Sequence, residues 1–359
     1  DIEVRVVAPS GTGLSQTDAI QGIPIRRFRY APRSRETLAY RGTMADDVSR
    51  SLVGKFALGS FLVAETAVLR SETSKWKPDV IHAHWWFPNG VAAATVSRLS
   101  RVPLVTTSHG TDLRLLREHA GARSLARYVL QRSARVTCVS QWLADQAAPL
   151  SASAPIVAPM PVAASLFAPS SDRDTNRIVF VGRLSAQKGI EFAIRALALM
   201  RRSIVLDVIG DGPDRAALTE LATTLGLSER VLWRGNVRHD EVPALLARAS
   251  ALVAPFTDEG LGLVAVEAQL CGTPPVGFAS GGLVDVIQDD VTGILVPLGD
   301  TAALATSLER IVTDPTLRVR LGTAGRASAL ERYTPDAVAT QYVRIYEDAV
   351  SGRAGDDAQ

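Results

Sequence analysis

The sequence is poor in the residues that cross-link small proteins or bind zinc. Only two of its 359 residues are cysteines, Cys138 and Cys271, and they lie far apart in the chain. Five residues are histidines, and none is spaced from a cysteine as zinc ligands are. These absences exclude a disulfide framework and a cysteine–histidine zinc site, and they suit a reducing compartment.

Long apolar runs are scarce as well. A membrane span needs about 18 apolar residues in a row, and the nearest run, residues 56–64, is interrupted by Glu65. Hydrophobic residues make up 47% and charged residues 21%, which is an ordinary globular balance. A chain of 359 residues is long enough for two domains. Because it begins at Asp1 directly in a strand pattern, we interpret it as a fragment or a processed chain.

The formal net charge is only +2, but the two parts of the chain differ in sign. Residues 1–150 contain 20 Lys and Arg against 12 Asp and Glu, whereas the remaining residues contain 19 against 25. A basic part can face an acidic substrate or an anionic membrane, or it can be a solvated surface. Both interpretations stay open for a segment rich in arginine, with Arg114, Arg117, Arg123, Arg127 and Arg132.

Strand patterns alternate with helix patterns in two series. The first series occupies residues 1–160 and includes a long helical pattern over residues 45–74. A segment rich in Pro, Ala and Ser follows, and we place the linker at residues 161–176. The second series covers residues 177–332, and a last helix is expected over 333–350. Such alternation predicts an α/β fold with two doubly wound, Rossmann-like domains.

The stretch that most suggests a binding site is residues 258–268, where an apolar strand pattern passes into a helix through a glycine-rich turn. Helix N-termini present free N–H groups and the positive end of a dipole, so anions bind there. Gly260 and Gly262 let a ligand approach the backbone. Glu259 and Glu267 flank the turn, and Glu267 can reach a diol from the helix. The alternative is a turn whose glycines only shape the chain.

A second turn of the same series carries cations. Gly182 ends a strand pattern, and Arg183 and Lys188 follow beside the start of the next helix. Two cations and a helix dipole that converge on one point fit two phosphates, and a metal ion is then unnecessary. Ordinary surface charge is the alternative. Gly210, in a tight turn after the next strand, adds another close approach at the same edge of the sheet.

The first series offers histidines at strand ends. His109 ends one strand pattern and is expected to face the crevice between the domains. His82 and His84 end a neighbouring pattern, and both a structural and a functional role stay open for them. Trp85 and the two aromatic residues after it can stack on an acceptor or pack in a core.

Five motifs of the second series, taken in order, resemble retaining glycosyltransferases of the GT-B fold, in particular the large fourth family, the group 1 glycosyltransferases. The hallmark of that family is a glutamate followed, after seven residues, by a second glutamate, here Glu259 and Glu267. The other matching stretches are residues 181–189, 209–213, 271–274 and 292–296. The resemblance covers most of residues 176–350 and, more loosely, 75–145. It implies two domains that face each other across a cleft, with the last helix crossing back to the first domain.

The resemblance also implies roles for single residues. Arg183 and Lys188 would bind the donor diphosphate, and Glu267 would hold the ribose hydroxyls. Glu259 would contact the transferred sugar, which His109 would reach from the other domain. The implied catalytic group is Glu259, His109, Arg183 and Lys188. Close approach to the donor is implied for Gly182, Gly210, Gly260, Gly262, Leu263 and Val264. The acceptor side would include Gly11, Gly13, His84, Trp85 and Asp112.

By the same resemblance, the chain transfers a sugar from a nucleotide-sugar, with UDP or GDP as the nucleotide, and retains the anomeric configuration. It needs no metal and no cofactor beyond that donor, and its acceptor is a sugar, a lipid-linked or a small molecule. A cytoplasmic location is expected, with peripheral membrane contact through the basic domain in cell-envelope glycan assembly, and no nucleic-acid partner.

Two alternatives and one departure accompany this interpretation. A non-catalytic nucleotide-sugar-binding protein or partner subunit is the main alternative. A nicotinamide dehydrogenase fits poorly, because the turn at residues 210–212 lacks the third glycine of its fingerprint. In the family, a strand and a glycine-rich loop precede the segment that matches residues 2–9, so we expect the first sheet to lack a central strand.

Overall fold

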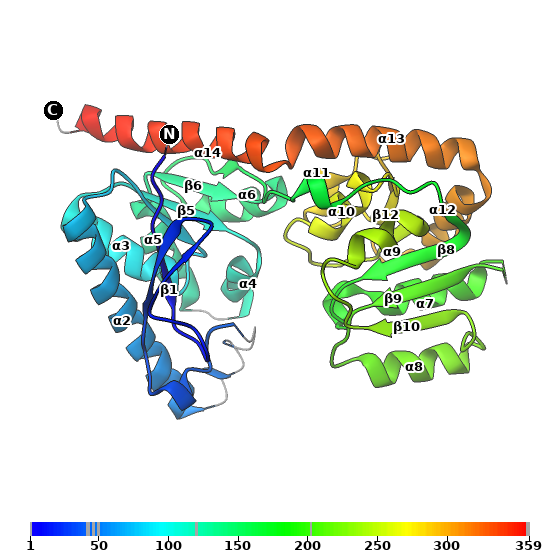
Figure 1. The fold of residues 1–359 in the computed structure, drawn as a ribbon, viewed down its shortest axis with the longest axis horizontal. Coiled ribbons are helices and arrows are strands. Elements are labelled where there is room, and N and C mark those ends of the chain that lie inside the picture. The colour runs from blue at the N-terminus through cyan, green and yellow to red at the C-terminus, as the bar shows by residue number, and fades with distance from the viewer. Residues whose placement is uncertain are drawn as a thin grey trace.

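The computed structural model describes residues 2–40, 44, 47–48, 51–118, 121–201 and 203–356. Its strands and helices form two α/β lobes that lie side by side (Figure 1). Two helices, α13 (Pro315–Arg332) and α14 (Pro335–Asp356), run along one edge of both lobes. The expected arrangement of two α/β domains and a final crossing helix is therefore present.

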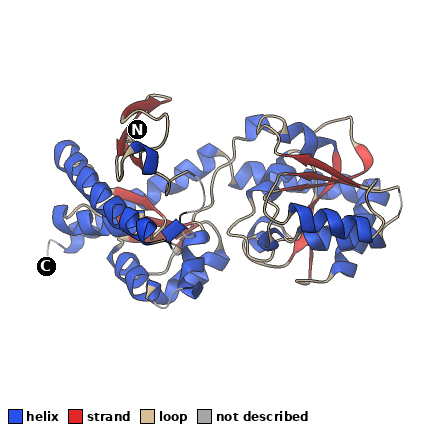
Figure 2. Cartoon of the chain, turned by 90° about the horizontal axis from the view of Figure 1, so that it is seen from below, coloured by secondary structure: helices blue, strands red, loops and turns tan. Residues whose placement is uncertain are grey.

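The strands of the first lobe form two separate sheets. The smaller sheet has the order β1-β3-β2, with β1 parallel and β2 antiparallel to β3. Its strands are β1 (Val6–Pro9), β2 (Thr17–Ile20) and β3 (Ile23–Phe28). The larger sheet is parallel throughout, and its strands in order are β4 (Ile81–His84), β5 (Leu104–Ser108), β6 (Arg135–Cys138) and β7 (Ile156–Val157). Figure 2 shows the smaller sheet standing apart from the larger one, in line with the expected gap between them.

Helices connect and cover these strands. Those of the first lobe are α2 (Leu52–Trp76), α3 (Asn89–Ser100), α4 (Thr111–Glu118), α5 (Ala122–Arg132) and α6 (Gln141–Ala147). The N-terminus of α2 is capped by Ser51 and that of α6 by Ser140, whose hydroxyls accept from N–H groups three residues on.

α2 begins within the expected helical region and extends two residues beyond its end, and it is more apolar than the interruption at Glu65 suggested. It has 25 residues and a window of mean hydropathy 1.6, so by length and composition it could cross a membrane, and 17% of that window is buried. Its inner face packs in a core, where Phe61 meets Phe28 with ring centroids 4.9 Å apart. Glu65 is buried on the helix, and burial raises the pKa of its carboxyl to about 8. The apolar run thus continues past Glu65, which the sequence analysis took as its end.

The second lobe is one six-stranded parallel sheet in the order β10-β9-β8-β11-β12-β13. Its strands are β8 (Asp174–Val181), β9 (Val205–Ile209), β10 (Val231–Gly235), β11 (Ala249–Ala254), β12 (Pro275–Phe278) and β13 (Ile294–Val296). Its helices are α7 (Ile190–Leu199), α8 (Arg215–Thr224), α9 (Val242–Arg248), α10 (Leu263–Leu270), α11 (Leu283–Val286) and α12 (Thr301–Thr313). Every residue of β11 is buried, as expected for a central strand covered on both faces.

α14 docks the end of the chain on the first lobe. Ile345 and Ala349 are 3% and 1% exposed and form a small core with Val105 of β5. The Gln341 amide donates a hydrogen bond to the carbonyl of Val157 in β7. The helix therefore holds the two lobes together across the larger sheet of the first lobe.

Candidate active site

The order in which strands are added to the sheet of the second lobe reverses between β8 and β11. β8, β9 and β10 follow one another toward one edge, and β11, β12 and β13 toward the other. Ligands of open α/β sheets bind outside the carboxyl ends of the strands at such a switch point. The loops at this point are residues 182–189, after β8, and residues 255–262, after β11. They are the two turns for which the sequence predicts anion binding.

Backbone contacts tie these two loops together. The Thr257 N–H donates to the carbonyl of Gln187 at 3.1 Å, and the Gln187 amide donates to the carbonyl of Asp258. Gly189, with a φ of 61°, packs so closely on the carbonyl of Pro255 that a Cβ would collide with it. The side chains that the loops carry are consequently held at a fixed separation.

Lys188 and Glu259 form an ion pair at this point. Their Nζ and Oε2 atoms are 2.5 Å apart, and the side chains are 24% and 18% exposed. The Lys188 ammonium also lies 4.6 Å from the centre of the Phe256 ring. Arg183 is exposed and forms no ion pair or hydrogen bond with another residue that the structure describes. One cation is therefore held in place and a second is accessible from solvent.

Glycines shape the neighbouring strand ends. The Gly182 N–H donates to the carbonyl of Ile209 at 2.9 Å, and a Cβ on Gly210 would collide with the carbonyl of Gly182. Gly262, with a φ of 89°, directly precedes α10, whose first turn contains Leu263 and Val264. The first N–H groups of α10 therefore point toward the loop that holds Glu259, where an anion is favoured.

Glu267 lies one turn into α10 and is half-buried. Burial raises the pKa of its carboxyl, and the nearby His239 opposes this shift. The carboxylate accepts no hydrogen bond from the residues that the structure describes. It is available to hydroxyl groups of a ligand, as the ribose assignment requires.

In the first lobe, two histidines meet at the carboxyl ends of β4 and β5. The Nδ1 atom of His84 lies 2.9 Å from the Nε2 atom of His109. The pKa of each imidazole is lowered to about 4, by burial for His109 and by burial together with the nearby His109 for His84. Because an imidazole is neutral above its pKa, both rings are uncharged at neutral pH.

Asp112 organises the loops that carry these histidines. Its carboxylate accepts hydrogen bonds from the backbone N–H groups of His109 at 3.1 Å, Gly110 at 3.0 Å and Trp86 at 3.3 Å. The indole N–H of Trp86 donates to the backbone carbonyl of Asp112 at 2.7 Å. The loops after β4 and β5 are thereby locked to one another.

The two lobes touch at two glycines. A Cβ on Gly110 would lie 3.1 Å from the Cα of Gly260, and a Cβ on Gly260 would collide with the carbonyl of His109. The loop with His109 thus lies directly against the loop with Glu259. The loop with Arg183 and Lys188, the N-terminus of α10 and His109 therefore lie close together.

Side chains fasten this contact. The Arg114 guanidinium donates to the Gln187 side-chain oxygen at 2.9 Å, and Arg117 pairs with Asp258 at 2.5 Å. On α6, the Gln141 N–H donates to the Asp285 carboxylate at 2.7 Å.

Two family models match the chain. Residues 1–158 match the model described as Glycosyltransferase Family 4, and residues 164–328 match the one described as Glycosyl transferases group 1. The chain is 32% identical over 311 residues to the 2-deoxystreptamine N-acetyl-D-glucosaminyltransferase of Streptomyces fradiae. The aligned region covers 77% of this chain and 73% of that enzyme. The chain belongs to the group 1 glycosyltransferases. A second relative, the D-inositol 3-phosphate glycosyltransferase of Frankia alni, is 33% identical over 343 residues, 83% of this chain and 81% of that protein.

Solved structures confirm the GT-B fold of this glycosyltransferase. Sucrose-phosphate synthase from Thermosynechococcus elongatus superposes with a TM-score of 0.79 at 22% identity, over 98% of this chain and 90% of that one. Anabaena HepE in complex with UDP superposes with a TM-score of 0.75 at 20% identity, over 96% of this chain and all of that one.

The expected acceptor-side residues of this glycosyltransferase differ in their surroundings. Asp112 is 2% exposed and occupied by backbone N–H groups, so it positions loops instead of facing an acceptor. Trp86 is 1% exposed and belongs to the core, whereas Trp85 is 42% exposed beside His109. The loop with Gly11 and Gly13 packs near Tyr40 and has no hydrogen bond to the histidines among the described residues.

Three residues that contact the site were not predicted from the sequence. His239, after β10, lies close enough to Glu267 to influence its pKa. Arg114 and Arg117, assigned to a face for lipid or solvent, instead fasten the two lobes. The contacts of Arg114 with Gln187 and of Arg117 with Asp258 link residues far apart in the chain. The one sequence signal for them was the position of both arginines on the segment that follows His109.

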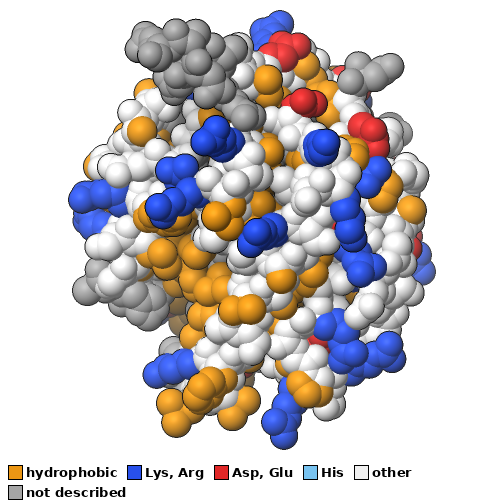
Figure 3. Space-filling view, turned by 90° about the vertical axis from the view of Figure 1, so that its left-hand side faces the viewer, with side chains coloured by type: hydrophobic (Ala, Val, Ile, Leu, Met, Phe, Trp, Pro, Cys, Tyr) orange, Lys and Arg blue, Asp and Glu red, His pale blue; other side chains and the backbone are white. Residues whose placement is uncertain are grey.

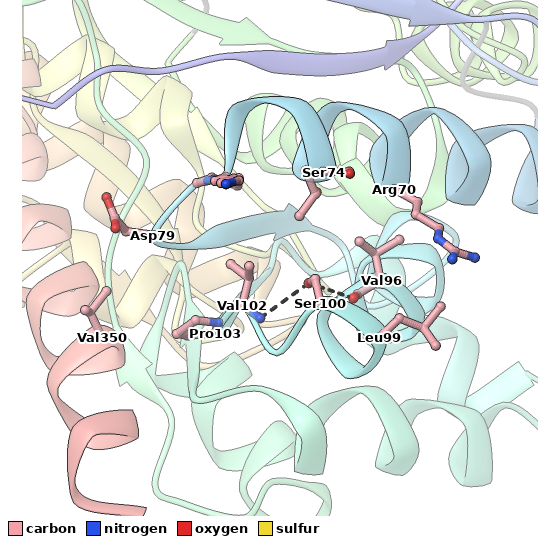
Figure 4. Close-up of a pocket in the computed structure, with 12 residues that line it drawn as sticks. Arg70, Ser74, Asp79, Val96, Leu99, Ser100, Val102, Pro103 and Val350 are labelled. Atoms are coloured by element: carbon pink, nitrogen blue, oxygen red, sulfur yellow. Dashed lines mark hydrogen bonds between the residues drawn. The ribbon is translucent and has the colours of Figure 1, made fainter. Parts of the chain in front are cut away.

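A hollow of about 550 Å³ lies away from this site. Figure 4 shows it between α2, α3 and α14, with Arg70, Asp79, Val102 and Val350 at its wall. Asp79 and Val102 precede β4 and β5, so the hollow is at the amino ends of these strands, opposite His84 and His109. Volume alone therefore does not mark the active site of this fold. Among the residues that the structure describes, no cluster of three or more His, Cys, Asp or Glu side chains is arranged to hold a metal.

Proposed function

We propose that this glycosyltransferase transfers a sugar from a nucleotide-sugar to an acceptor hydroxyl, with retention of the anomeric configuration and without a metal ion. The observation that carries the proposal is the Lys188–Glu259 pair at the switch point, beside the contact of Gly260 with His109. Each part of a nucleotide-sugar meets a suitable group there. The diphosphate fits the cations and the α10 N-terminus, the ribose fits Glu267, and the sugar fits Glu259 and His109.

In the proposed reaction, the bond between the anomeric carbon and the phosphate oxygen breaks, and its electron pair goes to the diphosphate. Lys188, Arg183 and the N–H groups of α10 stabilise this charge, and Lys188 and the N–H groups need no rearrangement because they are already fixed. The acceptor oxygen forms the new bond to the same carbon and gives up its proton. Lys188 can keep its pair with the Oε2 atom of Glu259 while it meets the phosphates, which leaves the Oε1 atom for the sugar hydroxyls.

Retention is compatible with a front-face reaction and with a covalent intermediate. A free carboxylate at the sugar would favour the covalent route, but the Glu259 carboxylate is engaged by Lys188. We therefore favour the front-face route, in which the departing phosphate oxygen takes the acceptor proton.

For the nucleotide we propose UDP or GDP; HepE, which shares the fold, was solved in complex with UDP. The alternative, a non-catalytic binder, is not favoured because the relatives that match over most of the chain are named as transferases. We keep the cytoplasm as the proposed location and a sugar, lipid-linked or small-molecule hydroxyl as the proposed acceptor.

Product stereochemistry and chelation test the reaction. With an α-linked nucleotide-sugar, we expect the first product detected by proton NMR to be the α-anomer. We expect its rate of formation to be unchanged by EDTA, because protein cations supply the charge that a metal would otherwise supply. A β-product, or a rate abolished by EDTA and restored by a divalent ion, would contradict the respective part of the proposal.

Peripheral contact with an anionic membrane is the proposed partner interaction of the first lobe. Figure 3 shows hydrophobic side chains interleaved with Lys and Arg at that end of the molecule. Leu52, Phe56 and Val63 of α2 are 72%, 77% and 71% exposed, and Arg70 is exposed on the same helix. An apolar helix face among cations fits a bilayer of anionic lipid.

Vesicle sedimentation tests this surface. We expect binding to vesicles that contain phosphatidylglycerol, little binding to phosphatidylcholine alone, and a several-fold loss in Phe56→Ser. Equal binding by Phe56→Ser would contradict the proposed surface. Loss of a dimer in that variant, seen by sedimentation velocity, would assign the face to a second copy.

A further inference from the structure

His84 and His109 are neighbours because of the strand register. β4 and β5 are adjacent and parallel, and His84 pairs with Thr107, two residues before His109. Both imidazoles therefore project from the same edge of the sheet, with His84 Nδ1 and His109 Nε2 2.9 Å apart. Between two neutral imidazoles, a hydrogen bond forms only when one nitrogen carries the proton and the other accepts it.

The backbone of His109 and its ring are held by different groups. Asp112 accepts the His109 N–H, and the His109 carbonyl lies against Gly260. Neither contact restrains the imidazole. Among the residues that the structure describes, the ring of His109 has one hydrogen-bond partner, the Nδ1 atom of His84.

The ring of His84 in turn packs against the ring of His82. Its ring lies 4.5 Å, between centroids, from that of His82. His82 is fixed at both nitrogens, by the Tyr346 hydroxyl of α14 at 2.8 Å and by the Thr107 hydroxyl at 2.6 Å. The Asn89 amide donates to the His84 carbonyl at 3.2 Å. The series of contacts that runs from Tyr346 of α14 through His82 and His84 ends at His109. The Nδ1 atom of His109 is therefore the ring nitrogen left for a ligand.

We propose that His84 is a positioning residue: it binds the Nε2 atom of His109, fixes the orientation of that imidazole and leaves Nδ1 as the nitrogen that meets the donor sugar. This inference rests on the proposed function and replaces the expectation that His84 contacts the acceptor. A ring free to rotate about its Cβ–Cγ bond would present Nδ1 to the sugar in only part of the molecules, so the sugar hydroxyl would find its partner in only a fraction of encounters.

A double-mutant cycle separates the two roles. We expect His84→Ala to lower kcat/KM about tenfold, the worth of one orienting hydrogen bond. In a His109→Ala background, the same change should have almost no further effect, because the ring on which it acts is gone. His84→Asn, whose side-chain amide can occupy the place of Nδ1, should keep most of the activity. A tenfold loss that persists in the His109→Ala background would overturn the proposal and restore a direct acceptor contact.

A measurement that does not depend on sugar transfer tests the role of His84 separately from the proposed function. In long-range ¹H–¹⁵N NMR of protein labelled in histidine, the Nε2 resonance of His109 should have the shift of a hydrogen-bonded nitrogen in the wild type and in His84→Asn, and should move in His84→Ala. An unchanged Nε2 resonance of His109 in His84→Ala would overturn the proposal. If no nucleotide-sugar supports transfer by the wild type, the proposed function fails, while the NMR result still decides the role of His84.

Discussion

Replacement of Lys188 by alanine is expected to lower kcat for sugar transfer by about 10²–10³, the usual cost of removing one fixed group that stabilises charge in a transition state. Lys188 is held at the switch point by Glu259 and by the Phe256 ring, so it needs no reorganisation when the diphosphate departs. Negative charge on the leaving group grows during the reaction, so the loss should fall mainly on kcat and less on KM for the donor.

Initial rates at saturating donor measure this effect. Arg195→Ala is a matched control, because Arg195 is a cation on α7 that pairs with Glu191 on the exposed surface. The control should keep wild-type turnover. If kcat of Lys188→Ala stays within threefold of the wild type, the proposed charge stabilisation is wrong.

Gly260→Ala should lower kcat/KM by about 100-fold, because a displacement of about 1 Å at the reacting groups has costs of that order. The new Cβ would collide with the carbonyl of His109, and both groups are backbone, so no side-chain rotation relieves the clash. The lobes must separate, and His109 moves away from the sugar. Affinity for the nucleotide alone should change little, because the diphosphate and ribose groups belong to the second lobe.

Gly59→Ala provides the comparison for this variant. Gly59 lies within α2, and a Cβ there meets nothing within 4 Å. It should retain wild-type kcat/KM with an unchanged or slightly higher Tm, since alanine favours a helix. Wild-type kcat/KM in Gly260→Ala would show that the contact of the lobes seen here is not used in transfer.

The second lobe was predicted well from sequence because its signals are local. A buried strand, a glycine turn and a helix follow one another within about a dozen residues at Lys188 and again at Glu259, and parallel topology brings such turns to one edge. The order of strands at the switch point then sets the two loops side by side.

The first lobe was predicted less well because its decisive contacts are not local. Which of two adjacent tryptophans is exposed depends on the left-handed φ of 67° at Trp85, which sends Trp86 into the core. The role of Asp112 depends on N–H groups from the loops after both β4 and β5. The strand β2 is exposed at all four residues, so no apolar alternation announced it.

The most direct test of the account is the melting temperature of this chain with UDP, GDP, ADP and their sugar conjugates, measured for the wild type and for Glu267→Ala. A ligand that binds only the folded state stabilises it by about 2.7 kcal/mol at 100 times Kd, or about 5–10 °C for a domain of this size. We predict such a shift for one nucleotide and its sugar conjugates, and its loss in Glu267→Ala, whose carboxylate would hold the ribose. Absence of a shift with every nucleotide, or an equal shift in Glu267→Ala, would contradict the donor site described here.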